Sequence, residues 1–227
     1  MRFAGFAIET RYASKNLMMA REVMAVSYYA TMNKMTVKVI PDPLKVPSDM
    51  IPCGTVKYCE KVLGKPVIPD YYPDFLQSHL YRKIWRTNTW PTVKGVFIKP
   101  ADQHKRFNGF LTKGGWKGKK RGPYICSDPV KFLNEWRYYV SNGKVLAAEW
   151  YQGDEVNTPD APELVIGIPE GYCGAMDFGI LSTGEFALVE THPPYACGWY
   201  GKDHNRYAEW LCWGWQYIRR IHETFSG

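Results

Sequence analysis

The dipeptide Asn142-Gly143 is the feature of this sequence that most constrains its fold. Asn-Gly is the strongest short-range signal of a β-hairpin, because the tight turn needs two residues that tolerate positive φ. It separates two apolar runs of strand character, residues 136–140 and 144–151. A second pair of runs, 173–180 and 186–190, flanks Ser182-Thr183-Gly184. The sequence therefore predicts two antiparallel hairpins in its second half.

The first ninety residues have a different pattern. Strands are expected at 2–9 and 35–40, and helices at 15–32, 55–63 and 75–85. Further on, strands are expected at 96–100 and 124–127, one helical turn at 129–133 and a C-terminal helix at 203–225. The fold class is therefore α+β. We expect a small α/β unit over residues 1–92 and an antiparallel-sheet domain over 93–227.

The chain of 227 residues carries a formal net charge of +7, which favours an anionic ligand such as a nucleotide, a nucleic acid or an acidic protein surface. Part of the excess lies in a Gly-rich segment, residues 113–121. A solvated loop and a contact to phosphate explain that segment equally well.

The six cysteines include no CxxC pair, so the sequence does not favour a zinc site. Neither a signal peptide nor an apolar run of membrane-spanning length is evident. Reduced thiols and a cytoplasmic location are the expectation, with no membrane partner.

Two basic residues lie in apolar strands. Lys99 ends the run 96–99 just before Pro100, where a lysine can reach toward phosphate or simply extend into solvent. Arg137 lies within the strand 136–140 and needs an anion to pair with. Glu135 is one candidate partner. A bound phosphate is the alternative.

Two carboxylates fall in the two arms of the second predicted hairpin. Asp177 lies in the first arm and Glu190 in the second, so the hairpin brings them side by side. Close carboxylates repel unless a cation lies between them or one is protonated, and Mg²⁺ that bridges ATP oxygens is a common solution. His192 faces the same way as Glu190. The set indicates phosphoryl transfer, although the chain has neither a Walker A motif nor G-x-G-x-x-G.

Five short motifs occur in a fixed order. They are Phe-Ile-Lys-Pro at 97–100, Lys-x-Phe-x-Gly at 105–109, Glu-Trp-Arg-x-Tyr-Val at 135–140, Asp-x-Gly at 177–179 and Val-Glu-x-His-Pro-Pro at 189–194. This order resembles the ATP-grasp superfamily, and within it the divergent R2K clade, which is named for one arginine and two lysines. That clade includes the eukaryotic cell-division-cycle assembly factor for translation initiation and phage and bacterial proteins. The resemblance runs from about residue 51 to 201.

The resemblance implies an ATP-grasp fold and a set of site residues. Lys99, Lys105 and Arg137 would bind ATP phosphates and serve catalysis. Ile125, Cys126 and Ser127 would form the hinge strand against adenine, and Glu135 would touch the nucleotide. Asp177 and Glu190 would bind Mg²⁺. His192 stands where most members carry an Asn metal ligand, so coordination and a contact to phosphate or substrate are both open. The loop 113–121 would cover the nucleotide.

The activity that the resemblance implies is ligation, in which ATP activates a carboxylate as an acyl phosphate and an amine displaces phosphate. The carboxylate and amine partners would include a protein or peptide. The alternative is an ATP-binding assembly factor or chaperone without ligase activity. A nucleic-acid partner rests on the net charge alone.

Overall fold

The computed structural model describes residues 3–10, 20–102, 106–115, 122–154, 156 and 159–224. A three-stranded parallel sheet of order β2-β1-β3 and two helices form its N-terminal unit. The strands are β1 (Gly5–Ile8), β2 (Thr36–Val39) and β3 (Met50–Cys53), and the helices are α2 (Ala20–Met32) and α3 (Val56–Leu63). A short 3₁₀ helix, Pro43–Lys45, connects β2 to β3. Thr55 caps α3 and Gly64 ends it in the left-handed conformation, so the predicted helix at 55–63 is confirmed.

The second sheet is antiparallel, with the order β4-β7-β5-β6. Its strands are β4 (Ile84–Thr87), β5 (Lys94–Pro100), β6 (Phe110–Lys113) and β7 (Tyr124–Ser127). The predicted helix at 75–85 is wrong. A 3₁₀ helix covers Asp74–His79, Tyr81 has a φ of 48°, and Ile84 begins a strand paired with β7. Leu76, Leu80 and Ile84 imitate a helical stripe because residues of two different elements pack on the same core.

The third sheet, of order β11-β10-β8-β9, contains both predicted hairpins. Its strands are β8 (Phe132–Ser141), β9 (Lys144–Gln152), β10 (Gly174–Leu181) and β11 (Phe186–His192). The helical turn predicted at 129–133 is wrong, because Phe132 already pairs with Leu181 across the sheet. Asn142 and Gly143 both have positive φ, as the predicted turn requires.

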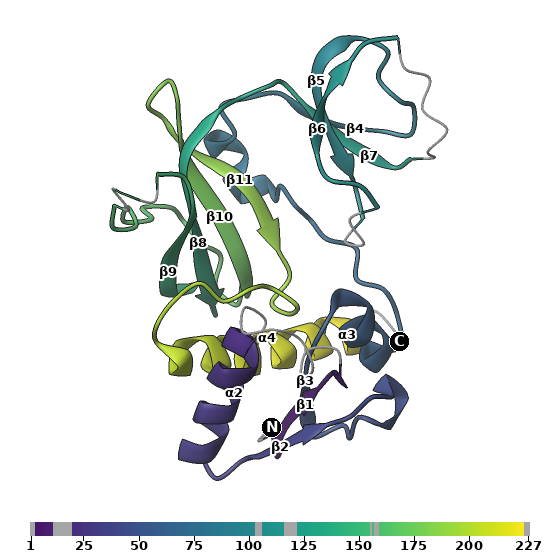
Figure 1. Ribbon diagram of the computed structural model, residues 1–227, viewed down its shortest axis with the longest axis vertical. Coiled ribbons are helices and arrows are strands. Elements are labelled where there is room, and N and C mark those ends of the chain that lie inside the picture. Colours follow the sequence, from purple (N-terminus) through teal and green to yellow (C-terminus); the bar gives the residue numbers. More distant parts are fainter. Residues whose placement is uncertain are drawn as a thin grey trace.

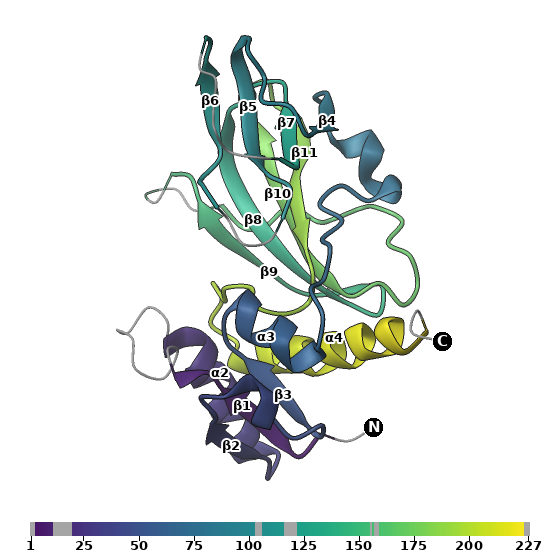
Figure 2. The same ribbon diagram turned by 90° about the vertical axis from the view of Figure 1, so that its right-hand side faces the viewer.

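The C-terminal helix α4 (His204–Thr224) lies between the third sheet and the N-terminal unit (Figures 1 and 2). One apolar core unites them, since Trp210 and Trp215 of α4 pack together with Phe6 of β1, Ile51 of β3 and Tyr139 of β8. A separate core lies on the third sheet and includes Trp136 and Phe178. Residues of the N-terminal unit up to Val67 thus share a core with α4, whereas Leu76 and Leu80 pack on the third sheet and β4 belongs to the second sheet.

The second and third sheets face each other on the same side of α4. In Figure 1 the second sheet lies above the third and is offset to the right. Residues 128–131 connect β7 to β8, and residues 80–83 connect the 3₁₀ helix Asp74–His79, which packs against β11, to β4. The connections are bonded to each other, because Lys83 N donates to Asp128 Oδ2 at 3.1 Å and Asp128 N donates to Lys83 O at 3.0 Å. All six cysteines are free thiols. In the described part of the chain, no helix is both long enough and apolar enough to cross a membrane.

Candidate active site

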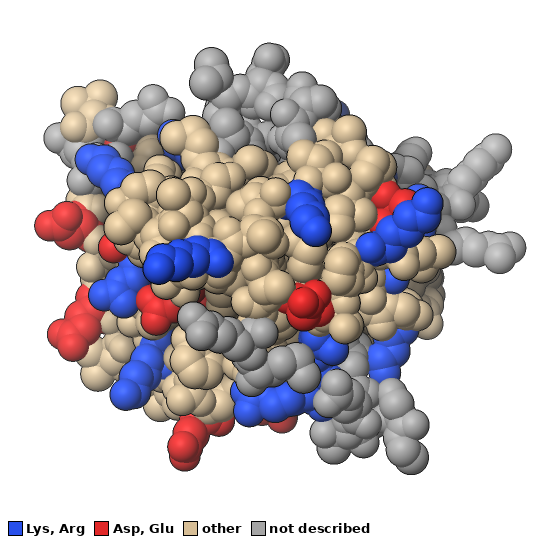
Figure 3. Space-filling model, turned by 90° about the horizontal axis from the view of Figure 1, so that it is seen from below, with Lys and Arg blue, Asp and Glu red and all other residues tan. Residues whose placement is uncertain are grey.

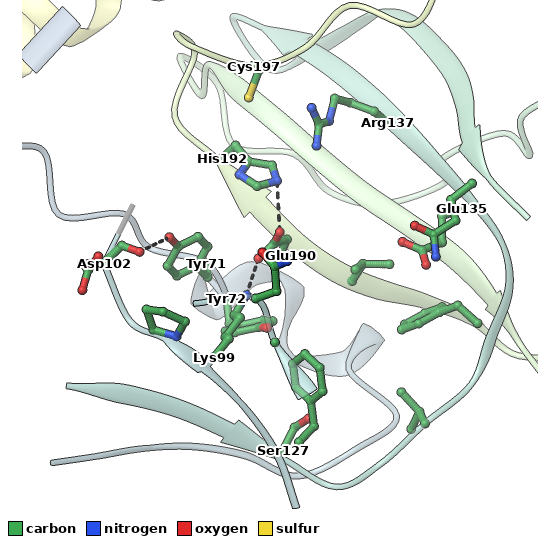
Figure 4. A pocket seen from close by; sticks show the side chains of 18 of the residues that line it. Tyr71, Tyr72, Lys99, Asp102, Ser127, Glu135, Arg137, Glu190, His192 and Cys197 are labelled. Atoms are coloured by element: carbon green, nitrogen blue, oxygen red, sulfur yellow. Dashed lines mark hydrogen bonds and ion pairs between the residues drawn. The ribbon is translucent and has the colours of Figure 1, made fainter. Parts of the chain in front are cut away.

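A cavity of about 660 Å³ lies between the second and third sheets. One part of its wall is apolar and is made by Phe97, Leu111, Val130, Phe132 and Val189. Another part is charged and is made by Lys99, Arg137, Glu190 and His192. Figure 4 shows Lys99 and Ser127 on one sheet, facing Glu135, Arg137, Glu190 and His192 on the other.

Five charged side chains form a continuous chain beside this cavity, with cations and carboxylates in alternation. Lys99 Nζ forms an ion pair with Glu190 Oε2. Glu190 Oε1 lies 3.3 Å from His192 Nε2, which is also 3.2 Å from Asp177 Oδ2. Arg137 Nε donates to Asp177 Oδ1 and Arg137 Nη2 to Asp177 Oδ2, both at 2.7 Å. The chain therefore begins and ends with a cation.

Strand register produces this arrangement. Asp177 is paired with Glu190 across β10 and β11 and with Arg137 across β10 and β8. Paired residues of antiparallel strands project on the same face, so the three side chains meet. The predicted proximity of Asp177 and Glu190 is thereby confirmed. Lys99 comes from β5 in the other sheet, so its ion pair with Glu190 bridges the cavity.

Burial and ion pairing together set the protonation of the five groups. Burial would raise the pKa of Asp177, but the Arg137 guanidinium lowers it to about 2. Burial also opposes ionisation of Glu190, yet Lys99 and His192 hold its pKa well below the usual range. Burial would lower the pKa of His192, whereas Glu190 and Asp177 raise it to about 10. At neutral pH the chain of five thus contains three cations and two carboxylates.

Aromatic rings surround the two terminal cations. The Lys99 ammonium lies 4.3 Å from the ring centroid of Tyr71 and 5.1 Å from that of Tyr72. The Arg137 guanidinium lies 5.4 Å from Tyr151 and 5.3 Å from Tyr200, and these two rings stack on each other. Such contacts stabilise a buried cation. The tyrosines were not predicted, because their distance from the basic residues in the sequence gives no signal.

Glu135 lines the cavity and accepts a hydrogen bond from Tyr151 Oη. Burial raises its pKa, and the Tyr151 hydroxyl opposes that shift only in part. Although residues two positions apart share a face of a strand, the Glu135 carboxylate is bonded to Tyr151 and the Arg137 guanidinium to Asp177, so the two side chains have different partners.

Arg82 is a further cavity residue that the sequence did not indicate. Its guanidinium donates to Leu80 O (3.0 Å), Leu188 O (2.7 Å) and Val189 O (2.9 Å). Because β11 is an edge strand, the outer carbonyl groups of β11 are available to such a donor. Arg82 therefore ties the connection before β4 to the strand segment that precedes Glu190.

The predicted hinge strand is in place, but only its last residue reaches the cavity. Ser127 lines the cavity, whereas Ile125 and Cys126 are buried and absent from its wall. The neighbouring strands β4 and β5 both pair with β7, so the backbone groups of Ile125 and Cys126 are engaged within the sheet. Lys105 and residues 116–121 of the basic loop lie outside the described residues.

Asp177, Glu190 and His192 each offer one ligand atom within 4.8 Å of the others. Two carboxylate oxygens suit Mg²⁺, whereas imidazole suits softer metal ions better. Asp177 and Glu190 therefore suit a divalent cation, which would have to displace the His192 imidazolium from between the two carboxylates. His192 itself occupies the position between the two carboxylates.

Among the solved structures with a similar fold are a synthetase and a ligase. N5-carboxyaminoimidazole ribonucleotide synthetase from Thermotoga maritima is 13% identical over 94% of this chain and 76% of its own, with a TM-score of 0.52. D-alanine–D-alanine ligase from Bacillus anthracis is 10% identical with full coverage of both chains, and its TM-score is 0.50. At these identities the likeness concerns the fold. No curated protein matches the sequence.

A family model of the ATP-grasp domain matches the chain, so the predicted α+β class and the predicted ATP-grasp fold are both confirmed. Residues 75–210, more than half of the chain, match the ATP-grasp domain of R2K clade family 2, and the protein belongs to that family.

Proposed function

We propose that this protein is an ATP- and Mg²⁺-dependent ligase that joins a carboxylate to an amine through an acyl phosphate. The observation that carries the proposal is the chain of five charges at the wall of the cavity. Three cations against two carboxylates leave a positive excess in a largely buried place, which favours a polyanion. The apolar part of the same wall suits a nucleobase.

In this proposal the adenine lies against Phe97, Leu111 and Phe132. The segment 127–130, which begins at the last paired residue of β7, supplies its polar contacts in place of Ile125 and Cys126. The triphosphate reaches Lys99 and Arg137, with Lys105 as the second lysine. Glu135 lies along the same wall, where it would contact the nucleotide.

Asp177 and Glu190 would hold Mg²⁺, which would neutralise charge on the phosphoryl group being transferred. In the first step an oxygen of the substrate carboxylate bonds to the γ-phosphorus, the bond to the β–γ bridging oxygen breaks, and ADP leaves. In the second step an amine nitrogen bonds to the acyl carbon, and phosphate leaves as the amine loses its proton. Lys99 and Arg137 would stabilise the charge on the transferring oxygens.

The acceptors would approach along Pro193–Tyr200, which contributes several residues to the cavity wall. Side chains from three elements fix its backbone: Tyr139 Oη donates to Gly198 O at 2.5 Å, Tyr207 Oη donates to Cys197 O at 2.8 Å, and Trp199 N donates to Glu22 Oε1 at 2.8 Å. Such a fixed wall can orient a reactant without a large entropic cost on binding. A protein or peptide is the acceptor class that we propose.

The proposal is tested by ADP release from ATP and Mg²⁺ in the presence of peptide and carboxylate pools, with hydroxylamine as a general amine. We expect ADP release to require a carboxylate, and a hydroxamate to form in equal amount. Asp177→Ala and Glu190→Ala should abolish both, while Asp160→Ala, which removes an exposed carboxylate, should not. ATP turnover that is unchanged in Asp177→Ala and Glu190→Ala would contradict the proposal. Tight ATP binding without turnover would favour an assembly factor instead.

A further inference from the structure

We propose that Asp177 and Glu190 act as internal competitors for the phosphate-binding cations, so that the site selects a metal–nucleotide complex over either component alone. This inference rests on the proposed function and concerns how the site recognises its nucleotide. It follows from a feature of the charge chain: each cation assigned to phosphate is already paired with a carboxylate assigned to the metal.

The pairing is complete at both ends of the chain. Lys99 is engaged by Glu190 Oε2, and Arg137 is engaged by both oxygens of Asp177. The side chains of Asp177 and Arg137 are only 2% and 9% exposed, and that of Lys99 is 14% exposed. Water therefore does little to replace a partner that leaves.

A nucleotide without metal would have to draw Lys99 and Arg137 toward its phosphates. Glu190 and Asp177 would then remain behind as buried carboxylates with only His192 between them, close to a further negative charge. The cost of leaving buried charges without partners opposes the gain from the new phosphate contacts. Binding of the free nucleotide should be weak.

Binding of a metal ion without nucleotide would instead leave the cations without partners. The ion would need oxygens of Asp177 and Glu190, whose present neighbours are Arg137, Lys99 and His192. The displaced ammonium and guanidinium would lose their partners and would face an added divalent charge. Binding of the free metal should also be weak.

The complex avoids both costs because partners are exchanged. Lys99 and Arg137 move from carboxylate to phosphate, while Glu190 and Asp177 move from cation to metal. Each charge keeps an opposite charge beside it throughout. By linkage, the factor by which metal tightens nucleotide binding equals the factor by which nucleotide tightens metal binding.

Calorimetric titration of a non-hydrolysable ATP analogue, with Mg²⁺ or with EDTA, tests the inference. In the unmodified protein we expect Mg²⁺ to tighten binding about 100-fold, near the upper part of the usual range of coupling. Glu190→Gln removes the competitor for Lys99, so binding in EDTA should become about tenfold tighter and the effect of Mg²⁺ should shrink. Asp102→Asn is the matched control, because Asp102 also lines the cavity but pairs with Arg106. It should leave the Mg²⁺ effect unchanged.

A reciprocal variant tests the same inference from the metal side and does not depend on Glu190→Gln being well folded. Lys99→Met frees Glu190, so Mn²⁺ alone, followed by its electron paramagnetic resonance signal, should bind about tenfold tighter than to the unmodified protein. Equal analogue affinity in Mg²⁺ and EDTA, or no tightening in either variant beyond that of Asp102→Asn, would overturn the inference while leaving the proposed function standing. Absence of analogue binding under both conditions would overturn the proposed function and the inference together.

Discussion

Arg137 and Asp177 form the most buried ion pair of the site, and each depends on the other. The guanidinium satisfies both carboxylate oxygens, and neither side chain is more than 9% exposed. Removing one partner of such a pair leaves an uncompensated buried charge, whereas removing both leaves none. The stability of this region should therefore respond very differently to single and double substitution.

We expect Arg137→Met to lower the free energy of unfolding by about 3–5 kcal/mol, measured by urea denaturation at neutral pH. Adding Asp177→Asn should recover at least half of the loss, because the buried carboxylate is then gone. Lys144→Met, an exposed position on β9, is the control and should change stability by less than about 0.5 kcal/mol. A double variant as unstable as the sum of the two single variants would contradict this account.

For individual residues, the sequence predicts some contacts of the site and not others. An arginine within an apolar strand needs an anion, and that need was predicted for Arg137. The anion itself was not, because Asp177 lies forty residues away, on a strand that is a neighbour of β8 in space and not through a hairpin. Asp177 and Glu190, by contrast, belong to one hairpin, so their proximity was predictable from a local turn.

Elements whose conformation is set by neighbouring residues were predicted from the sequence. Elements whose conformation is set by contacts with distant segments were not. Asn142-Gly143 specifies its turn through its own backbone preferences, and both hairpins formed as expected. The segment 75–85 has the apolar spacing of a helix, yet the pairing of Trp85 with Cys126 makes its end a strand. Strand pairing with a distant segment overrides local propensity.

The contact between α4 and the turn after β11 is another tertiary feature, and Gly214 makes it possible. A Cβ at this position would lie 2.4 Å from Pro194 Cβ and 2.7 Å from Pro194 O. Pro194 follows His192 by two residues and lies within the segment 193–200, which contributes several residues to the cavity wall. Close packing at Gly214 therefore sets the distance between the helix and that wall.

Gly214→Ala should be destabilising, although alanine is the better helix former by about 1 kcal/mol. Overpacking of this kind costs about 1–3 kcal/mol, so we expect a net loss of stability in urea denaturation. The affinity for the metal–nucleotide complex should also fall, because the displaced wall adjoins His192. Asn205→Ala, at an exposed position of the same helix, should show neither effect. A more stable Gly214→Ala protein would show that helix propensity outweighs the contact with Pro194.

For the whole molecule, net charge is a weaker guide than the placement of charges. The face of the N-terminal unit seen in Figure 3 has Lys and Arg side chains scattered among Asp and Glu side chains. On that face the described residues form no continuous basic surface. Lys99 and Arg137 lie instead on the wall of the cavity between the two sheets. The nucleic-acid hypothesis thus keeps the net charge as its only support.

The cooperativity of the whole chain depends on α4, which is last in sequence and central in the fold. Its residues Tyr207, Trp210 and Trp215 are buried in the core that also contains Phe6 and Ile51 of the N-terminal unit. Without α4 that core would be exposed to water, and burial of its apolar surface is the main stabilising contribution. A fragment of residues 1–92 should therefore lack a stable fold, although it contains three paired strands and two helices.

We expect the 1–92 fragment to show no cooperative urea transition by circular dichroism, and the full chain to unfold in one transition that tryptophan fluorescence and circular dichroism report alike. Adding residues 93–227 as a separate chain should restore structure to the fragment, because α4 and β8 then complete its core. A fragment that unfolds cooperatively by itself would instead make residues 1–92 an independent folding unit. In that case packing against α4 would orient the N-terminal unit beside the cavity without being needed to fold it.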